Sequence, residues 1–242
     1  EVCILTNFYS GNFYHWLTED MIRVAVLEAS GFTGDYVIAG LPDFCRQCLA
    51  LVGIAPDRIL TDVHHPVRFR AAHYVTPIHG GLARNYKSAY MAVRDMLRAA
   101  TSHLVSGRRR LWLDRRSGVN NPGRDLANPE EVMPILARYG IETVDMAAYP
   151  VAEQIAMAQS ASFIGGVHGA GFAHTLFMPE ASSVAECFAP TFINPGIFGL
   201  CTILNHDYSM LVHEIAYDGY PDGKKVRINT AHLELVLQRI CA

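Results

Sequence analysis

The feature that most constrains this chain is a glycine-rich segment, Phe163-Ile-Gly-Gly-Val-His-Gly-Ala-Gly-Phe172, in which a short apolar run stops at a turn. Beyond the turn, Phe172, Leu176 and Phe177 return at a helical spacing. The segment therefore predicts a strand, a tight turn and a helix. In parallel α/β sheets this is the corner at which ligands bind.

The turn also has the chemistry of an anion site. Gly166, Gly169 and Gly171 have no Cβ, so a ligand can approach the backbone closely. The backbone N–H groups from Ala170 onward and the positive end of the following helix favour a phosphate, and His168 adds a hydrogen-bond donor. The segment alone leaves one alternative open, an ordinary strand–helix corner whose glycines serve packing.

The rest of the chain alternates apolar strands with amphipathic helices. The predicted strands are 2–6, 36–39, 58–61, 69–75, 110–113, 143–146, 163–166, 183–188 and 210–215. The predicted helices are 13–27, 42–52, 83–104, 128–139, 151–160, the one after the glycine turn, and 230–241. This order predicts an α/β protein of two Rossmann-like lobes with a cleft between them, the first lobe short. We expect boundaries at 1–82 for the first lobe, 83–106 for a linking helix and hinge, and 107–242 for the second lobe.

Composition narrows the class of protein. The chain has 242 residues, half of them hydrophobic, and a net charge of −3, which argues against a nucleic-acid surface. No apolar stretch is long enough to span a membrane, although a chain that begins at Glu1 leaves a removed leader or anchor open. Cys45-Arg-Gln-Cys48 lies in the middle of a predicted helix, so we expect buried, reduced thiols. Such thiols suit the cytoplasm.

Three charged residues are candidates for a donor site in the second lobe. Arg115 and Arg116 directly follow strand 110–113, so their guanidinium groups reach the glycine turn if the two strands are neighbours. Two guanidinium groups beside a helix N-terminus would bind a diphosphate. The alternative is that both arginines are solvated in a loop. Glu186 lies within an apolar strand, where an unpaired carboxylate is costly. We expect it to reach the strand's carboxyl end and to pair there with a ribose or sugar hydroxyl.

The first lobe offers a candidate general base. His15 and Glu19 are four residues apart on the predicted helix 13–27, so they face the same way. A carboxylate one turn away holds a histidine in one tautomer and raises its basicity. Glu19 or Asp20 is the substitute base. The alternative is a histidine packed among aromatic residues beside a surface glutamate.

Several catalytic motifs are absent from the sequence. It has no D-x-D pair, no H-E-x-x-H and no G-x-x-x-x-G-K-[ST], which argues against metal dependence and ATP hydrolysis. The His-Gly-Ala-Gly run is like the oxyanion loop of lipases, but no G-x-S-x-G elbow accompanies it, so a hydrolase is disfavoured.

Taken together, the motifs resemble those of glycosyltransferase family 61. The matching segments, in order, are 12–19, Arg115-Arg116 with 128–131, Glu153-Gln154, 165–171, 176–179 and 184–188. The resemblance implies a GT-B arrangement, a nucleotide-sugar donor bound by the second lobe, an acceptor on the first, inversion, and no metal or cofactor. Two departures are the Asn128-Pro129-Glu130 run, where the family usually has Asn-Glu, and the short first lobe. The roles of Glu130 or Glu131 and of the acceptor site therefore stay open.

The implied mechanism divides the work between the lobes. Arg115, Arg116, His168 and the turn stabilise the departing nucleoside diphosphate, while His15 takes the proton of an acceptor hydroxyl on a glycan or other molecule. Two other functions stay open: a catalytically silent relative that binds glycans or a partner, and a polysaccharide-modifying transferase with another donor, such as a pyruvyl donor. We expect a bacterial cytoplasmic protein, with peripheral association at the inner membrane face left open. Sugar, linkage and oligomeric state are not predicted.

Overall fold

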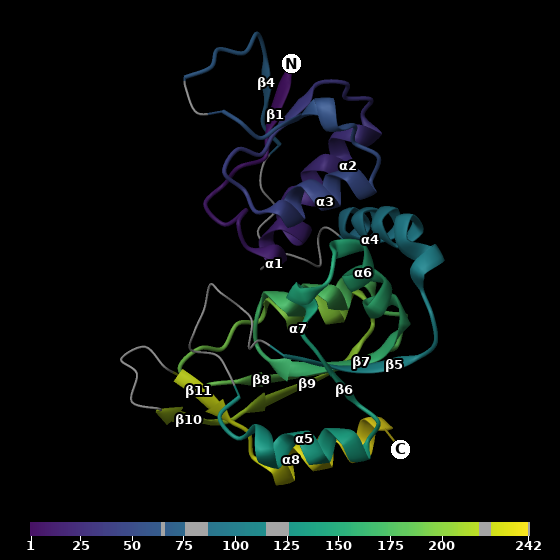
Figure 1. Cartoon of the computed structure of the whole chain (residues 1–242), viewed down its shortest axis with the longest axis vertical. Coiled ribbons are helices and arrows are strands. Elements are labelled where there is room, and N and C mark those ends of the chain that lie inside the picture. Colours follow the sequence, from purple (N-terminus) through teal and green to yellow (C-terminus); the bar gives the residue numbers. More distant parts are fainter. Residues whose placement is uncertain (64–65, 76–86, 115–125, 218–223, 242) are drawn as a thin grey trace. The chain divides into compact units, whose positions relative to one another are not determined.

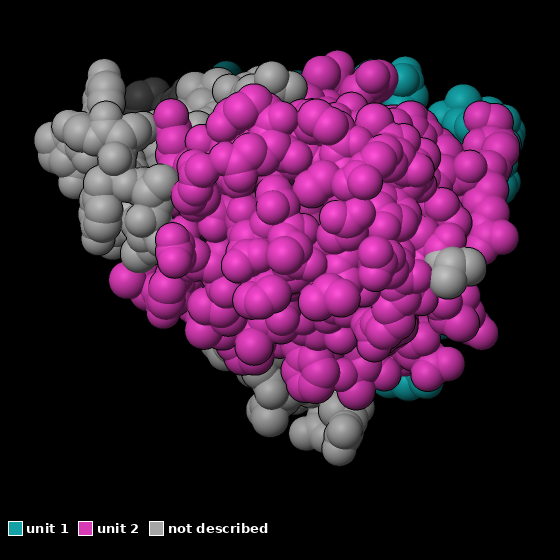
Figure 2. Space-filling view, turned by 90° about the horizontal axis from the view of Figure 1, so that it is seen from below, with its two compact units in different colours: residues 1–105, 150–156 teal, residues 106–149, 157–242 magenta. Residues whose placement is uncertain are grey.

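The structure is a computed structural model, and it describes residues 1–63, 66–75, 87–114, 126–217 and 224–241 (Figure 1). Contacts divide the chain into two compact units, coloured separately in Figure 2. Unit 1 is Glu1–Val105 with Pro150–Ala156, and unit 2 is Ser106–Tyr149 with Met157–Ala242. The helix predicted as a linker therefore belongs to unit 1, while the three-part division at 1–82, 83–106 and 107–242 stays a prediction.

Unit 1 is built on a small sheet of four parallel strands in the order β3-β2-β1-β4. These strands are β1 (Val2–Ile4), β2 (Asp35–Val37), β3 (Ile59–Leu60) and β4 (Ala72–His73). All are shorter than the sequence predicted, and only Ala72–His73 of the predicted strand 69–75 pairs with β1. The parallel order with helical crossovers confirms an α/β unit of Rossmann type.

The first helix of unit 1 is continuous but irregular. It runs through α1 (Phe13–His15), a π-helical turn (Trp16–Asp20) and α2 (Met21–Ala29), and the side chain of Asn12 accepts from the backbone N–H of Tyr14 at its start. The predicted helix 13–27 is thus confirmed, with a π-bulge that the spacing did not show. Such bulges are frequent at functional sites.

The remaining helices of unit 1 are α3 (Asp43–Leu51), a 3-10 turn (Pro56–Arg58), and α4 (Lys87–Thr101) with a 3-10 turn (Ser102–Leu104). Pro42 caps α3 from just outside the helix, so its predicted place as the first helical residue is wrong by one position. Cys45 and Cys48 are buried and free, as predicted. Burial raises the pKa of both thiols, which keeps them unreactive.

Unit 2 contains a parallel sheet of five strands in the order β6-β5-β7-β8-β9. The strands are β5 (Arg109–Leu113), β6 (Glu142–Val144), β7 (Ala161–Val167), β8 (Ser183–Phe188) and β9 (Asp207–Val212). Helices α5 (Pro129–Arg138) and α8 (Thr230–Cys241) cover one face side by side, and their apolar residues share a core with Trp112 and Phe163 (Figure 1). The Rossmann-like class predicted for this unit is confirmed.

Three features of unit 2 differ from the sequence prediction. Helix α7 (Gly196–Ile203) and strand β11 (Lys224–Arg227) were not predicted. The predicted strand 210–215 is divided between β9 and β10 (Glu214–Tyr217), because β10 leaves the sheet to pair antiparallel with β11. The helix after the glycine turn is a 3-10 helix (Ala170–Phe177), whereas α6 (Val151–Ser160) and α8 match their predictions. No helix in the described part of the chain is long and apolar enough to cross a membrane.

Candidate active site

The glycine turn lies at the carboxyl end of β7, in the middle of the unit 2 sheet. The backbone N–H of His168 donates to the carbonyl of Cys187 on β8 at 2.9 Å, which fixes the start of the turn. Gly169 caps the 3-10 helix, and the N–H of Phe172 donates to its carbonyl at 3.0 Å. The N–H groups of Ala170 and Gly171 precede the first bond of this helix, so they are donors for an anion.

The glycines of the segment differ in how much room their surroundings leave for a side chain. A Cβ on Gly165 would lie 2.6 Å from the ring of Phe163, and one on Gly166 would lie 3.0 Å from the carbonyl oxygen of Leu113. Gly166 also has a φ of +152°, which side-chain-bearing residues rarely adopt. Packing of β7 against β5 thus explains Gly166 without a ligand, and its donor-binding role stays a prediction. A Cβ on Gly171 would make an ordinary contact at 3.5 Å.

The side chain of His168 is held by a buried carboxylate on the next strand. Its Nδ1 lies 2.5 Å from Oε1 of Glu186, and Tyr208 on β9 donates its hydroxyl proton to Oε2 at 2.6 Å. Glu186 is 0% exposed, whereas the side chain of His168 is 13% exposed and stacks on Phe188 at 4.8 Å. Both oxygens of Glu186 are therefore engaged within the chain. This differs from the ribose or sugar contact that the sequence suggested, because the neighbouring strands supply the partners.

A second histidine supports the turn from inside and was missed in the sequence. His174 is 1% exposed, and its Nδ1 lies 2.7 Å from the carbonyl oxygen of Gly171. Burial lowers the pKa of His174 to about 4, so the ring is neutral at physiological pH and Nδ1–H donates to the carbonyl. The sequence feature that could have indicated this contact is the spacing of three residues between Gly171 and His174 in a predicted helix.

Arg115 and Arg116 lie outside the described residues. The strand that leads to them is nevertheless in place, because β5 pairs in parallel with β7 and Leu113 lies opposite Gly166. The condition on which their assignment depended, that the two strands are neighbours, is therefore confirmed. Their contact with a diphosphate stays a prediction.

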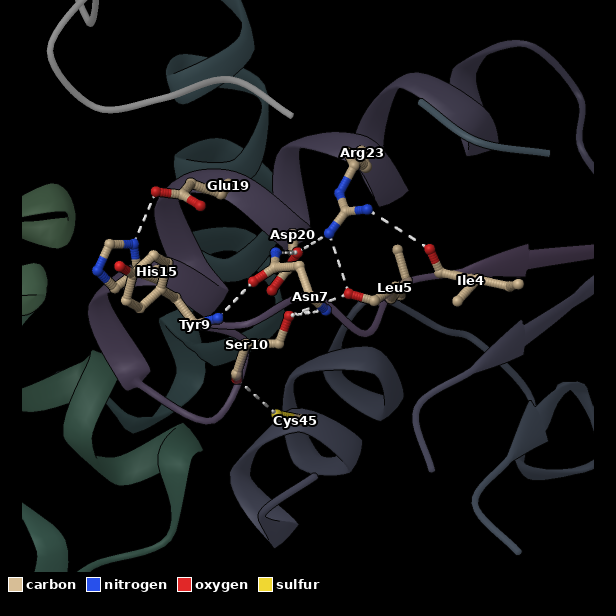
Figure 3. Close-up of polar contacts among 10 residues, drawn as sticks. All are labelled: Ile4, Leu5, Asn7, Tyr9, Ser10, His15, Glu19, Asp20, Arg23 and Cys45. Carbon is tan, nitrogen blue, oxygen red and sulfur yellow. Dashed lines mark hydrogen bonds and ion pairs between the residues drawn. The ribbon is translucent and has the colours of Figure 1, made fainter. Parts of the chain in front are cut away.

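Unit 1 contains the other predicted pair. His15 Nδ1 lies 2.7 Å from Glu19 Oε1, and the ring of Tyr9 stacks on the imidazole at 4.8 Å (Figure 3). The His15 side chain is 29% exposed and that of Glu19 only 4%. Within the described residues Nε2 of His15 makes no hydrogen bond. The arrangement leaves one ring nitrogen to take a proton while the carboxylate orients the other.

Asp20 is placed differently from the substitute base that the sequence suggested. It is completely buried, forms an ion pair with Arg23 and accepts from the side chain of Asn7 at 2.8 Å (Figure 3). Arg23 in turn donates to the carbonyl of Leu5 at 3.0 Å, just past the end of β1. This network joins the helix to the sheet, and a carboxylate held in this way does not suit proton exchange with a substrate.

Comparison with known protein families gives one match, to the family model described as Glycosyltransferase 61, which covers residues 13–185. The chain belongs to glycosyltransferase family 61. The matched range includes the His15–Glu19 pair, the glycine turn and His168, and it ends beside Glu186. A comparison with curated proteins found no match.

Two solved structures similar to this family 61 chain are of TibC. One is the iron-containing dodecameric glycosyltransferase TibC from enterotoxigenic E. coli H10407, with a TM-score of 0.41, 11% identity, and coverage of 77% of this chain and 57% of that one. The other is the dodecameric iron-containing heptosyltransferase TibC with ADP-D-beta-D-heptose, with a TM-score of 0.43, 13% identity, and coverage of 90% and 63%. The chain thus spans about three fifths of their length, and likeness at this level assigns neither activity nor ligand.

Proposed function

We propose that this family 61 protein transfers a sugar from a nucleotide-sugar donor to a hydroxyl group of a glycan or other acceptor, with inversion and without a metal. Unit 2 binds the donor, and unit 1 supplies the base. The observation that carries the proposal is the glycine turn at the carboxyl end of β7. There the backbone N–H groups of Ala170 and Gly171 precede the first bond of the 3-10 helix, and His168 is held by Glu186. A nucleoside diphosphate is the leaving group that such a turn stabilises.

The chemistry is a single displacement. His15 Nε2 takes the proton of the acceptor hydroxyl while that oxygen attacks the anomeric carbon of the donor. The bond from the anomeric carbon to the diphosphate oxygen breaks, and both electrons leave with the nucleoside diphosphate. Attack from the face opposite the leaving group inverts the anomeric configuration. The negative charge that develops on the diphosphate is met by His168, by the turn N–H groups, and by Arg115 and Arg116.

Metal-free stabilisation is part of this proposal. Among the residues that the structure describes, no group of three or more histidine, cysteine, aspartate or glutamate side chains is placed to hold a metal ion. The positive partners proposed for the diphosphate are instead side chains and backbone dipoles. An assay in the presence of a chelator separates the two possibilities.

The first test is a thermal-shift screen against nucleoside diphosphates and nucleotide sugars, with ADP-heptose included because the TibC complex contains it. A donor at 100 times its dissociation constant adds about 2.7 kcal/mol to stability. Donors that bind are then incubated with pooled hydroxyl acceptors, and the anomeric configuration of the product is read by NMR. An inverted glycoside supports the proposal. Retention, or a bound donor that is never turned over, contradicts it, and the latter result indicates a catalytically silent relative.

A further inference from the structure

Glu186 is a charged group in the interior of unit 2. It lies on the inner strand β8, between β7 and β9, with its carboxylate completely buried, and its hydrogen bonds go to His168 on one side and Tyr208 on the other. A carboxylate in such a place is costly unless a positive partner accompanies it. Among its hydrogen-bond and ion-pair partners in the described chain there is no lysine or arginine. His168 is the ion-pair partner that the described chain provides.

The other titratable groups around Glu186 are kept neutral. Burial raises the pKa of Tyr208, and the negative charge of Glu186 raises it further. The pKa values of Cys187, beside it on β8, and of Cys201 on α7 are raised by the same two causes in the same order. None of these neighbours is therefore an ion-pair partner of the carboxylate.

Several contacts hold His168 in one orientation. Its backbone N–H is bound to the carbonyl of Cys187, its ring stacks on Phe188 with an interplanar angle of 22°, and its Nδ1 faces Glu186. The contact with Glu186 and the stacking on Phe188 therefore set which way the ring of His168 faces at the turn.

We propose that Glu186 and Tyr208 are positioning residues of the donor site, which act through His168 and hold its ring facing the diphosphate. Glu186 then makes no contact with the sugar nucleotide, and Tyr208 keeps the carboxylate turned toward the ring. The inference rests on the proposed function for the identity of the anion. The arrangement of the three side chains is independent of that function and can be measured in the ligand-free protein.

The first experiment measures the ring-nitrogen signals of His168 directly. Protein labelled with 15N-histidine is examined by long-range 1H–15N correlation at neutral pH, and the His168 signals are assigned by their loss in His168→Gln. In Glu186→Gln, which keeps the shape and removes the charge, we expect the ring-nitrogen signals of His168 to shift, because Nδ1 loses the carboxylate that holds it. Signals that Glu186→Gln leaves unchanged would overturn the inference.

The second experiment is a double-mutant cycle on the binding of UDP, ADP, GDP and CDP, measured by calorimetry. Loss of a charge-assisted contact predicts that His168→Gln and Glu186→Gln each weaken the binding about ten- to hundred-fold. If Glu186 acts through His168, the double variant binds no more weakly than His168→Gln alone. Additive losses would show that Glu186 acts on the ligand by another route and would overturn the inference.

Two further variants keep the test decisive. Glu214→Gln removes an exposed carboxylate from strand β10, outside the five-stranded sheet, and should change neither the His168 signals nor diphosphate affinity. If Glu186→Gln does not fold, Tyr208→Phe takes its place: it removes one hydrogen bond from the carboxylate and should shift the His168 signals and weaken binding in the same coupled way. If the wild type binds no nucleoside diphosphate, the proposed function fails and the donor role fails with it. The ring signals still decide whether Glu186 holds the ring of His168.

Discussion

Acid should destabilise unit 2 through His174, which lies directly under the glycine turn. Its pKa is about 4 in the folded protein, against 6.5 for an unperturbed histidine, because burial disfavours the charged ring. Above pH 6.5 the ring is neutral in both states, so it does not affect stability. Between pH 6.5 and 4 the unfolded chain takes up a proton that the folded chain does not. The free energy of unfolding therefore falls as the pH falls through this window.

The size of the effect follows from the two pKa values. The difference between a pKa of 6.5 in the unfolded chain and about 4 in the folded protein lowers the free energy of unfolding by about 3.4 kcal/mol when the pH is below both values. At pH 5 the loss is already about 2 kcal/mol. This is a large part of the ~5–15 kcal/mol that typically stabilises a folded protein. The pKa of His213, which follows β9, is also lowered to about 4, mainly by burial, so a similar second contribution is expected from that residue.

The assay uses the fact that the chain has two tryptophans, Trp16 in unit 1 and Trp112 in unit 2. In a Trp16→Phe background, urea unfolding followed by fluorescence reports on Trp112. We compare the pH dependence between 7 and 4 with and without His174→Asn, which keeps a hydrogen-bond donor and cannot titrate. The variant should lose about 3 kcal/mol less over this range, whatever its stability at pH 7. The control, His103→Asn at an exposed position, should follow the parent, and equal slopes for His174→Asn would refute the reasoning.

The other predictions concern the candidate active site and the strand packing that supports it. Arg115→Ala or Arg116→Ala should weaken nucleoside diphosphate binding by calorimetry about ten- to hundred-fold, and normal binding by both folded variants would place the site elsewhere. His15→Ala should lower turnover by about 10²–10⁴ and leave the dissociation constant of the donor unchanged, so near-full turnover would exclude it as the base. Activity should survive EDTA, whereas loss that manganese restores would contradict metal-free transfer. Gly166→Ala should cost about 1–3 kcal/mol in urea unfolding because of its φ of +152° and its contact with β5, while Gly171→Ala, with ordinary room for a Cβ, should cost less.

Local geometry explains which parts of the site could be predicted. His15 and Glu19 are four residues apart on a helix, and that spacing alone brings them together, as the 2.7 Å contact confirms. The strand–turn–helix corner was likewise readable from three glycines after an apolar run. Its 3-10 form was not, since the same apolar spacing suits an α-helix of this length.

Burial was harder to predict than proximity. Trp16, Asp20 and Arg23 lie on one line of the helix, and a charged pair on a helix is normally solvated. In the structure, Arg23 instead reaches the carbonyl oxygens of Ile4 and Leu5 at the end of β1, and Asp20 accompanies it into the interior. The buried carbonyl groups at the end of β1 need hydrogen-bond donors, and Arg23 supplies them. The sequence of the helix alone does not indicate this requirement.

The two histidine–carboxylate pairs show how far residue type determines chemistry. The pair on the helix of unit 1 has a histidine that is 29% exposed, and Glu19 accepts from it with no described tyrosine bound to the carboxylate. In unit 2 the carboxylate is completely buried, accepts from Tyr208 as well, and contacts Nδ1 of a histidine that is only 13% exposed. A base must release its proton in each cycle, which the exposed ring can do to water. A group that contacts a diphosphate must instead be held in place, and the buried carboxylate of Glu186 does this for the ring of His168. Glu186 meets its partners only through the order β7-β8-β9, across 18 and 22 residues of chain, so this second assignment required the strand order.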